Sequence, residues 1–184
     1  MTNNTVRIIA GKYKGRKIKF PSINGLRPTS DRIKEIIFNW LQPYIHGAIC
    51  IDAFAGSGSL GIEAISRGAN KSIFYEININ AISHIKNNLI SLNINNFQIS
   101  QTDSIKALEM LATENHDYII LLDPPFDKGI ANIAIDVISN NDSILKGTIV
   151  YVETEKNCSL NLEKFEILKE KKTGNILVRL IVKA

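Results

Sequence analysis

From residue 48 onward, short apolar runs alternate with segments whose apolar residues recur at helical spacing, and this alternation strongly restricts the fold. Strands are expected over 48–54, 72–75, 97–100, 118–122 and 148–152. Helices are expected over 59–67, 82–92, 105–111 and 130–137. Because parallel strands need crossover connections, the pattern predicts an α/β fold with a doubly wound, mostly parallel sheet.

The two ends of the chain depart from this alternation. Residues 6–20 combine β-prone side chains with Gly11 and Gly15, which is typical of a small hairpin or pair of loops. Thr29, Ser30 and Asp31 are N-cap candidates for a helix in which Trp40 is expected to pack into the core. The apolar stripe of this helix has helical spacing and consists of Ile33, Ile36, Ile37, Trp40 and Leu41. The runs 165–169 and 176–182 flank Thr173-Gly174-Asn175, a sequence typical of a tight turn, which favours an antiparallel C-terminal hairpin. We expect one domain over residues 1–184, with a basic extension at 1–28 and a core at 29–184.

Bulk properties favour a cytoplasmic globular protein. The 184 residues are 45% hydrophobic and 22% charged, and the sequence contains neither a membrane-length apolar run nor an N-terminal secretory signal. We therefore expect no membrane partner, and a monomer is the default expectation for such a chain. The two cysteines and three histidines lack the spacing of a metal site, so no metal is expected.

The positive charge is concentrated at one end of the chain. Residues 1–42 hold nine lysines and arginines against two acids, a net charge of +7, whereas the 13 basic and 16 acidic residues of the remainder give −3. Such a segment attracts a polyanion, so it favours a nucleic-acid partner over a solvated arm without a partner. An acidic membrane surface is less favoured, because the segment lacks a strong apolar face.

A glycine-rich loop follows the first strand of the core. Gly56, Gly58 and Gly61 form the G-x-G-x-x-G pattern, and Glu76 stands at the end of the next strand, where its carboxylate could hold the hydroxyls of a ribose. A nicotinamide cofactor fits this pattern as well as S-adenosylmethionine does. Asp52 favours the second, because a carboxylate beside the loop repels a pyrophosphate but accepts hydrogen bonds from an amino-acid amine.

A third acid follows the strand at 97–100. Asp103 could accept a hydrogen bond from the amine of an adenine, and it is equally suited to be the N-cap of the next helix. Both roles remain open at this point.

The strand at 118–122 ends in Asp123-Pro124-Pro125-Phe126. Consecutive prolines make a stiff corner whose carbonyls are free acceptors. An exocyclic base amine is a poor nucleophile, and hydrogen bonds accepted from its protons by Asp123 and a corner carbonyl favour a more pyramidal nitrogen. Phe126 can stack on a base that has been flipped out of its helix. The corner therefore predicts methylation of a base amine, with guanine N2 and adenine N6 both possible.

Several of these stretches resemble the bacterial small-subunit ribosomal RNA guanine-N2 methyltransferases of the RsmD family. The resemblance covers nearly the whole chain, and its most specific parts lie in the N-terminal segment. It is carried by residues 7–16, 26–32, 38–41, 52–58, 60–64, 66–68, 123–126 and 151–153.

The resemblance implies a class I, Rossmann-like methyltransferase fold, S-adenosylmethionine as methyl donor, and a guanine of 16S ribosomal RNA, in the small subunit or its assembly intermediate, as acceptor. Asp123, Pro124, Pro125 and Phe126 are the predicted catalytic residues. The predicted cofactor residues are Asp52, Phe54, Gly56, Ser57, Gly58, Glu76, Asp103 and Ser104. The predicted RNA-binding residues are Arg7, Lys12, Lys14, Arg16, Lys17, Arg27, Thr29 and Arg32, and of these Arg27, Thr29 and Arg32 could instead face the cofactor carboxylate.

Three rival functions remain to be weighed. An adenine-N6 methyltransferase acting on DNA would use the same corner, but it usually needs a recognition insertion for which this chain has no room. A nicotinamide-dependent oxidoreductase is disfavoured by Asp52 and by the lack of a candidate proton donor. A non-catalytic RNA-binding assembly protein is disfavoured by the intact corner at 123–126.

Overall fold

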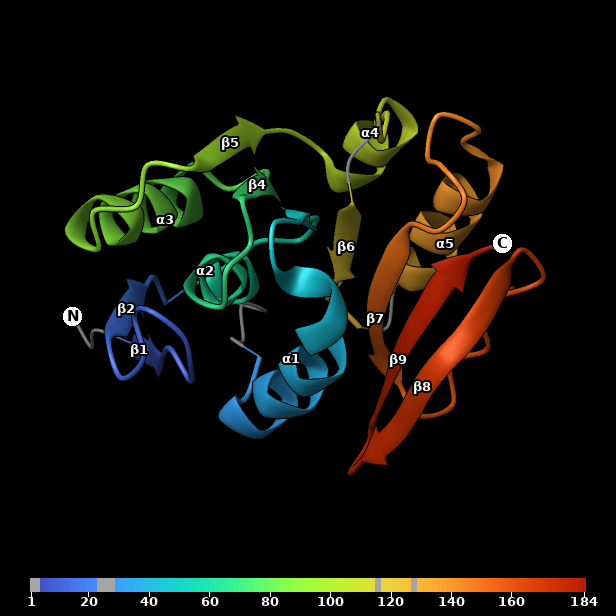
Figure 1. The fold of residues 1–184 in the computed structure, drawn as a ribbon, viewed down its shortest axis with the longest axis horizontal. Helices are drawn as coiled ribbons and strands as arrows, with labels where there is room; N and C mark the ends of the chain where they lie inside the picture. The colour runs from blue at the N-terminus through green and yellow to red at the C-terminus, as the bar shows by residue number, and fades with distance from the viewer. Residues whose placement is uncertain (1–3, 23–28, 115–116, 127–128) are drawn as a thin grey trace.

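The computed structural model describes residues 4–22, 29–114, 117–126 and 129–184. A two-stranded hairpin precedes a seven-stranded sheet with helices on both faces (Figure 1). The strands are β1 (Asn4–Arg7), β2 (Lys17–Phe20), β3 (Ile49–Asp52), β4 (Lys71–Glu76), β5 (Phe97–Gln101), β6 (Tyr118–Leu122), β7 (Ile149–Glu155), β8 (Phe165–Thr173) and β9 (Ile176–Lys183). The helices are α1 (Asp31–Ile45), α2 (Ser59–Ser66), α3 (Ile79–Ser91), α4 (Ser104–Glu109) and α5 (Ile130–Asn140).

The sheet order is β5-β4-β3-β6-β7-β9-β8. Strands β3 to β7 are mutually parallel, whereas β9 runs antiparallel between β7 and β8. The predicted doubly wound fold and the antiparallel C-terminal hairpin are therefore both confirmed. The strand order reverses between β3 and β6, and ligands of such sheets bind at the carboxyl ends of the strands beside this switch point.

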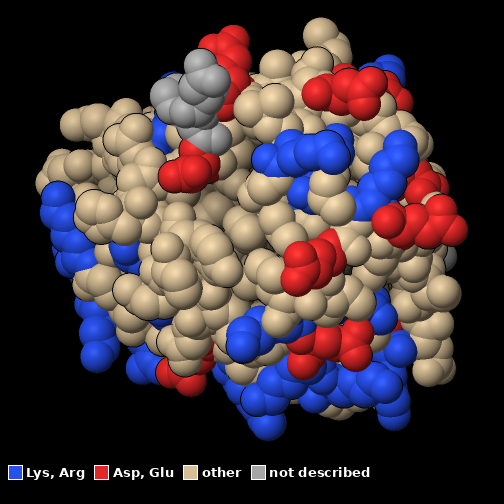
Figure 2. Space-filling model, turned by 45° about the vertical axis from the view of Figure 1, so that its right-hand side comes forward, with Lys and Arg blue, Asp and Glu red and all other residues tan. Residues whose placement is uncertain are grey.

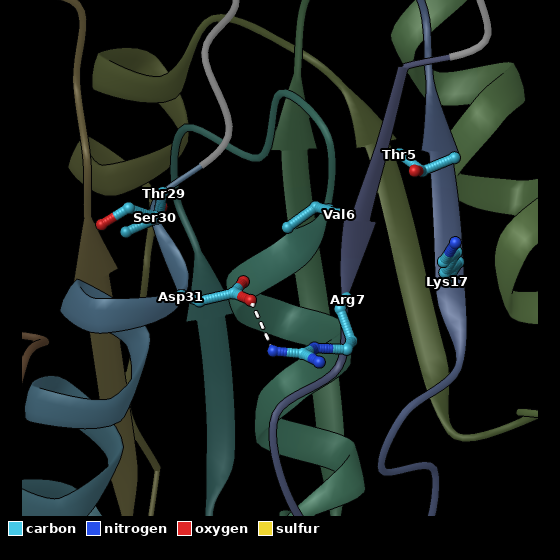
Figure 3. Close-up of a pocket in the computed structure, with 7 residues that line it drawn as sticks. All are labelled: Thr5, Val6, Arg7, Lys17, Thr29, Ser30 and Asp31. Carbon is cyan, nitrogen blue, oxygen red and sulfur yellow. Dashed lines mark hydrogen bonds and ion pairs between the residues drawn. The ribbon is translucent and has the colours of Figure 1, made fainter.

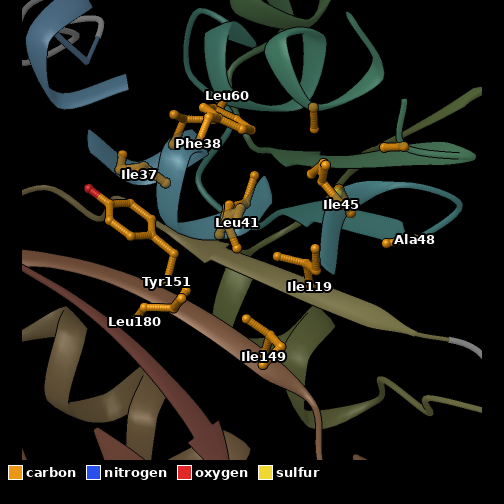
Figure 4. Packing of buried hydrophobic residues seen from close by; sticks show 14 of the residues in the cluster. Ile37, Phe38, Leu41, Ile45, Ala48, Leu60, Ile119, Ile149, Tyr151 and Leu180 are labelled. Atoms are coloured by element: carbon orange, nitrogen blue, oxygen red, sulfur yellow. The ribbon is translucent and has the colours of Figure 1, made fainter. Parts of the chain in front are cut away.

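Three apolar clusters hold the helices onto the sheet. On one face, α1 packs Ile37, Phe38 and Leu41 against residues of β6, β7 and β9 (Figure 4). On the other face, α5 packs Ala134, Ile135 and Ile138 against strand residues that include Val150 and Val152. These β6 and β7 runs are buried on both sides, which explains why their sequences are continuously apolar.

Helix α1 begins where the sequence predicts. Ser30 is its N-cap, with a hydroxyl that accepts from the backbone N–H of Ile33 at 3.3 Å. Trp40 is half-buried against the α1 cluster, which confirms a packing role. Among the described residues no helix combines the length and the apolar character needed to cross a membrane.

The N-terminal hairpin is fastened to the core by buried polar contacts. Glu63 of α2 is fully buried, and its carboxylate accepts the backbone N–H groups of Ile9 and Ala10 at 2.8 and 3.0 Å. Arg67 pairs with the same carboxylate at 2.8 Å. Apolar residues of β1 and β2 also pack against α2 and α3. The hairpin is thus a fixed part of the structure rather than a free arm.

Candidate functional site

The carboxyl ends of neighbouring strands bring the predicted acids to one edge of the sheet. Asp52 ends β3 and Glu76 ends β4, while Asp103 follows β5 and Asp123 follows β6. Because β3 lies between β4 and β6, the glycine loop and the proline corner are adjacent. The sequence could predict this meeting, since parallel strands present their carboxyl ends on the same side.

The glycine loop turns tightly from β3 into α2. Gly58 is the N-cap of α2 with a φ of +75°, a conformation that side chains rarely adopt. At Gly61 an added Cβ would lie 2.3 Å from the Phe74 ring, so glycine is needed for the helix to pack on β4. Oδ2 of Asp52 accepts the backbone N–H of Gly61 at 2.9 Å, which joins the strand end to the first turn of the helix.

Glu76 supports the loop from the neighbouring strand. Its Oε2 accepts the backbone N–H of Gly56 at 2.8 Å, and its Oε1 accepts those of Ile77 and Asn78 at 2.9 and 2.8 Å. Each carboxylate oxygen has two lone pairs, so Oε2 retains the capacity to accept a hydroxyl. The carboxylate is therefore fixed in direction and half-buried, a suitable arrangement for accepting a hydroxyl of a ribose.

Asp52 lies in an environment that penalises its negative charge. Burial raises the pKa of its carboxyl to about 8, against the lowering effect of the Gly61 hydrogen bond, and the charges of Asp123 and Glu76 add to the increase. The side chain is 2% exposed. A carboxylate in this position favours a cationic ligand group, because a cation relieves the penalty for ionisation.

The remaining cofactor candidates lie around the same loop and the next strand end. Asp103 is the N-cap of α4, with Oδ1 accepting from Lys106 at 3.1 Å, so its capping role is confirmed and its adenine role stays a prediction. Ser57 is buried, with its hydroxyl accepting from Ser59 at 3.3 Å. Phe54 packs at the edge of the α5 cluster, and Ser104 is half-buried at the start of α4.

The proline corner holds Asp123 half-buried at the end of β6. Thr29, which is buried just before α1, donates its hydroxyl to Oδ2 of Asp123 at 2.8 Å. Burial raises the pKa of Asp123 to about 6, and the Thr29 hydrogen bond opposes that increase. Pro124 is buried, whereas Pro125 and Phe126 are exposed, and the Phe126 ring is 36% accessible. The corner therefore offers an oriented carboxylate beside an exposed aromatic ring.

Besides Asp52, the structure places a second buried acid near the corner, Glu153, to which the sequence assigned no role. Glu153 of β7 is 4% exposed, and its Oε2 accepts the hydroxyl of Tyr151 at 2.8 Å. Burial and the charge of Asp123 raise the pKa of Glu153 to about 8, although the Tyr151 bond opposes this. The signal in the sequence was the position of Glu153, directly after the apolar run 149–152 of the same strand.

Buried acids of this kind predict a pH-dependent stability. The native protein binds more protons than the unfolded chain between about pH 4.5 and 8, so its stability falls as the pH rises through that range. Glu153→Gln should therefore raise the free energy of unfolding more at pH 8.5 than at pH 5.5 in urea titrations. Glu166→Gln, at an exposed position on β8, is the matched control. An equal effect of Glu153→Gln at both pH values would contradict the assigned burial penalty.

The predicted RNA-binding residues divide into two groups. Arg7 and Lys17 line a pocket of about 340 Å³ with Thr5, Val6 and residues 29–31 (Figure 3), and Arg7 pairs with Asp31 at 3.2 Å. Arg32 is exposed in the first turn of α1. This group lies beside the segment that contacts Asp123. Arg27 falls outside the described residues.

The second group lies at the tip of the hairpin, away from the acids. The backbone N–H of Lys12 donates to the carbonyl of Ser66, the last residue of α2, at 2.7 Å. Arg16 donates to the carbonyl of Ser91, the last residue of α3, at 3.5 Å. Both helices start at the carboxyl edge of the sheet and end at the opposite edge, so the tip, with exposed Lys14, is near the opposite edge. Thr29 is likewise buried against Asp123 rather than presented to solvent.

Comparison with known proteins gives consistent matches along the chain. The model of the family described as conserved hypothetical protein 95 matches residues 6–182. The chain is 43% identical to ribosomal RNA small subunit methyltransferase D of Haemophilus influenzae, covering 95% of this chain and 92% of that protein. It is 35% identical to the Escherichia coli protein of the same name, covering 95% and 88%. A solved structure from Escherichia coli that has been assigned as a methyltransferase superposes with a TM-score of 0.85 at 34% identity, covering 98% of both chains.

Proposed function

Because this chain belongs to the family of ribosomal RNA small subunit methyltransferase D, we propose that it methylates the exocyclic N2 amine of a guanine in small-subunit 16S ribosomal RNA. It is a methyltransferase, and S-adenosylmethionine is the proposed donor. The observation that carries the proposal is the oriented Asp123 carboxylate next to the glycine loop of β3. We further propose that the protein acts in the cytoplasm, as a monomer, on the small subunit or an assembly intermediate.

The residues at the carboxyl edge suit a donor that carries positive charge and no phosphate. Asp52, buried and with a raised pKa, would accept hydrogen bonds from the donor's amine, and the backbone of Gly56 and Gly58 would lie against its methionine part. Glu76 would hold the ribose, and Asp103 the adenine. Phe54, Ser57 and Ser104 would complete the walls of this site. The bound donor would supply a methyl group that its sulfonium already activates, so the reaction would need no metal.

The acceptor chemistry falls to the proline corner. Oδ2 of Asp123 accepts the hydroxyl of Thr29, which leaves Oδ1 to accept a hydrogen bond from one N–H of the base amine. The carbonyl of Asp123 or Pro124 would accept a hydrogen bond from the second N–H of the amine, and Phe126 would stack on the base. When the nitrogen gains its methyl group it must lose one proton, and Asp123 lies where it can take it. Such positioned acid–base groups contribute about 10²–10⁴-fold to a rate.

This role of Asp123 predicts a pH-dependent rate. Only the ionised carboxylate can take up the proton that the base amine loses, so kcat/KM should rise as the pH passes through the pKa of Asp123, about 6 in the free protein. Thr29→Val removes the hydrogen bond that lowers this pKa, so the midpoint should move to higher pH. Thr29→Ser keeps the hydroxyl and should keep the wild-type midpoint. Rate profiles between pH 5 and 9 measure this, and identical midpoints for the valine and serine variants would argue against the Thr29 role.

An assay of methyl transfer from isotope-labelled donor tests the function directly. Small subunits lacking the modification, naked 16S RNA and duplex DNA should be offered in parallel, with nucleoside analysis of the products. Label in N2-methylguanosine from RNA substrates is the expected outcome. Label in N6-methyladenosine would establish the rival acceptor. Donor binding without transfer to any of the three would refute the proposed substrate.

A further inference from the structure

The hairpin formed by β8 and β9 carries a second set of basic residues, at the same edge of the sheet as the acids. The hairpin turn joins Thr173 to Ile176, and Ile176 pairs with Glu155 at the carboxyl end of β7. The backbone N–H of Lys156 donates to the carbonyl of Asn175 in that turn at 2.8 Å. We use the name hairpin lysines for four exposed residues here: Lys156, Lys169, Lys171 and Lys172.

The ammonium groups of the hairpin lysines have no side-chain partner among the residues that the structure describes. Within the described part of the chain, none of the four forms an ion pair or donates a side-chain hydrogen bond. Other lysines are engaged: Lys34 donates to the carbonyl of Arg7, and Lys183 to that of Asn141 at 2.7 Å. The acid amid the hairpin lysines, Glu170, is paired with Arg179 at 2.7 Å. The positive charge of the hairpin lysines is therefore available to a ligand in solution.

Strand register relates these lysines to the proline corner. Lys171 pairs with Val178, which pairs with Glu153, so the three residues form one row across the sheet. Asp123 follows Leu122, the partner of Val152, and so continues that row by one strand. Three strand spacings put the backbone of Lys171 about 15 Å from that of Asp123. Lys169, two residues before Lys171 on the strand, projects from the same face of the sheet.

The two basic groups thus lie on opposite sides of the proline corner. Arg7, Lys17 and Arg32 lie on the side of the N-terminal hairpin, whereas the hairpin lysines lie beyond β7 and β9. Figure 2 shows lysine and arginine side chains gathered along the lower edge of the molecule, where Figure 1 has the turn between β8 and β9. A group of acidic side chains lies between them.

We propose that the hairpin lysines bind phosphates of the RNA strand that flanks the target base. The proposal rests on the proposed function, because it takes RNA as the substrate of the site. A flipped base at Asp123 leaves its neighbouring nucleotides running to either side, and each side then meets a basic surface. Contacts to phosphate position a nucleic acid without reading its sequence. The hairpin lysines therefore set affinity and orientation, while the corner sets the chemistry.

Lysines on β8 also have a purely structural explanation. β8 is an edge strand of the sheet, and lysines on edge strands discourage pairing with other chains. That explanation predicts aggregation of the variants without any change in RNA binding. The phosphate-binding role predicts the converse, so the two are separable by experiment.

The test is the double variant Lys169→Gln/Lys171→Gln, with Lys86→Gln/Lys146→Gln as the control of equal charge change. Lys86 and Lys146 are exposed, on α3 and before β7. Binding to 16S RNA is measured across salt concentrations, together with light scattering and methyl-transfer kinetics. We expect the hairpin variant to bind roughly ten-fold more weakly, to raise KM without a matching loss of kcat, and to reduce the salt slope by about 2.

The control should keep the wild-type slope. Equal slopes for the two double variants would overturn the proposal, and aggregation of the hairpin variant with an unchanged slope would assign its lysines to edge protection alone. If wild-type protein failed to methylate RNA, the proposed function would fall instead. The salt slopes report phosphate contacts independently of turnover, so the two failures are distinguishable.

Discussion

Asp123→Ala should lower kcat for methyl transfer by about 10²–10⁴-fold while leaving the Kd for S-adenosylmethionine within a few-fold of wild type. The carboxylate is oriented by Thr29 at the proline corner, where the acceptor amine would lie, whereas the proposed donor contacts come from the β3 loop and from Glu76 and Asp103. Removing Asp123 therefore removes a group that acts on the acceptor and spares the donor site.

Single-turnover kinetics and calorimetric titration of the donor measure the two quantities separately. Asp136→Ala, at an exposed position on α5, controls for loss of a surface carboxylate. Asp123→Asn keeps the shape and should recover little activity, since an amide carries no charge and cannot take the proton. A variant that turned over normally, or one that lost donor binding together with turnover, would contradict the assigned role.

Glu63→Ala should destabilise the protein by roughly 3–5 kcal/mol, because it leaves Arg67 and two backbone donors without their buried partner. The side chain of Arg67 is only 8% exposed, so water cannot replace the lost carboxylate. The N-terminal hairpin should be loosened first, since the carboxylate joins it to α2.

Urea denaturation followed by fluorescence gives the change in stability, and limited proteolysis reports whether cleavage begins in residues 4–20. Glu109→Ala, at an exposed position on α4, should change stability by less than about 0.5 kcal/mol. A similar small effect at Glu63 would mean that the hairpin is held by its apolar contacts alone.

The sequence was sufficient to predict the sheet and the meeting of its acids. The spacing of apolar residues and the positions of glycines locate the strands in the sequence. Because the strands are parallel, the acids at their carboxyl ends, Asp52, Glu76 and Asp123, lie at the same edge of the sheet. The capping roles of Ser30 and Asp103 also follow from local chemistry, because each precedes a helix with a suitable side chain.

Contacts between distant segments could not be predicted in this way. Lys34 was counted with the N-terminal positive charge, yet it is 1% exposed and donates to the carbonyl of Arg7. The hydrogen bond from Thr29 to Asp123 joins residues that are 94 positions apart in the sequence, so no local sequence pattern predicts it. The tip of the N-terminal hairpin, at Lys12, lies away from the acids at the carboxyl edge because Glu63 and Ser66 hold it against α2. A count of charges along the sequence cannot predict such a tertiary contact.

The crowding of carboxyl groups at one edge couples ligand charge to protons. With Asp52 and Glu153 each having a pKa of about 8, the carboxyl edge of the free protein holds protons at neutral pH that a bound cation would expel. Donor binding should then release protons and strengthen as the pH rises. If the donor is S-adenosylmethionine, as proposed, methyl transfer would convert its sulfonium to a neutral thioether, and the same edge would attract the spent molecule less. The charge of the protein would then favour exchange of spent donor for fresh donor.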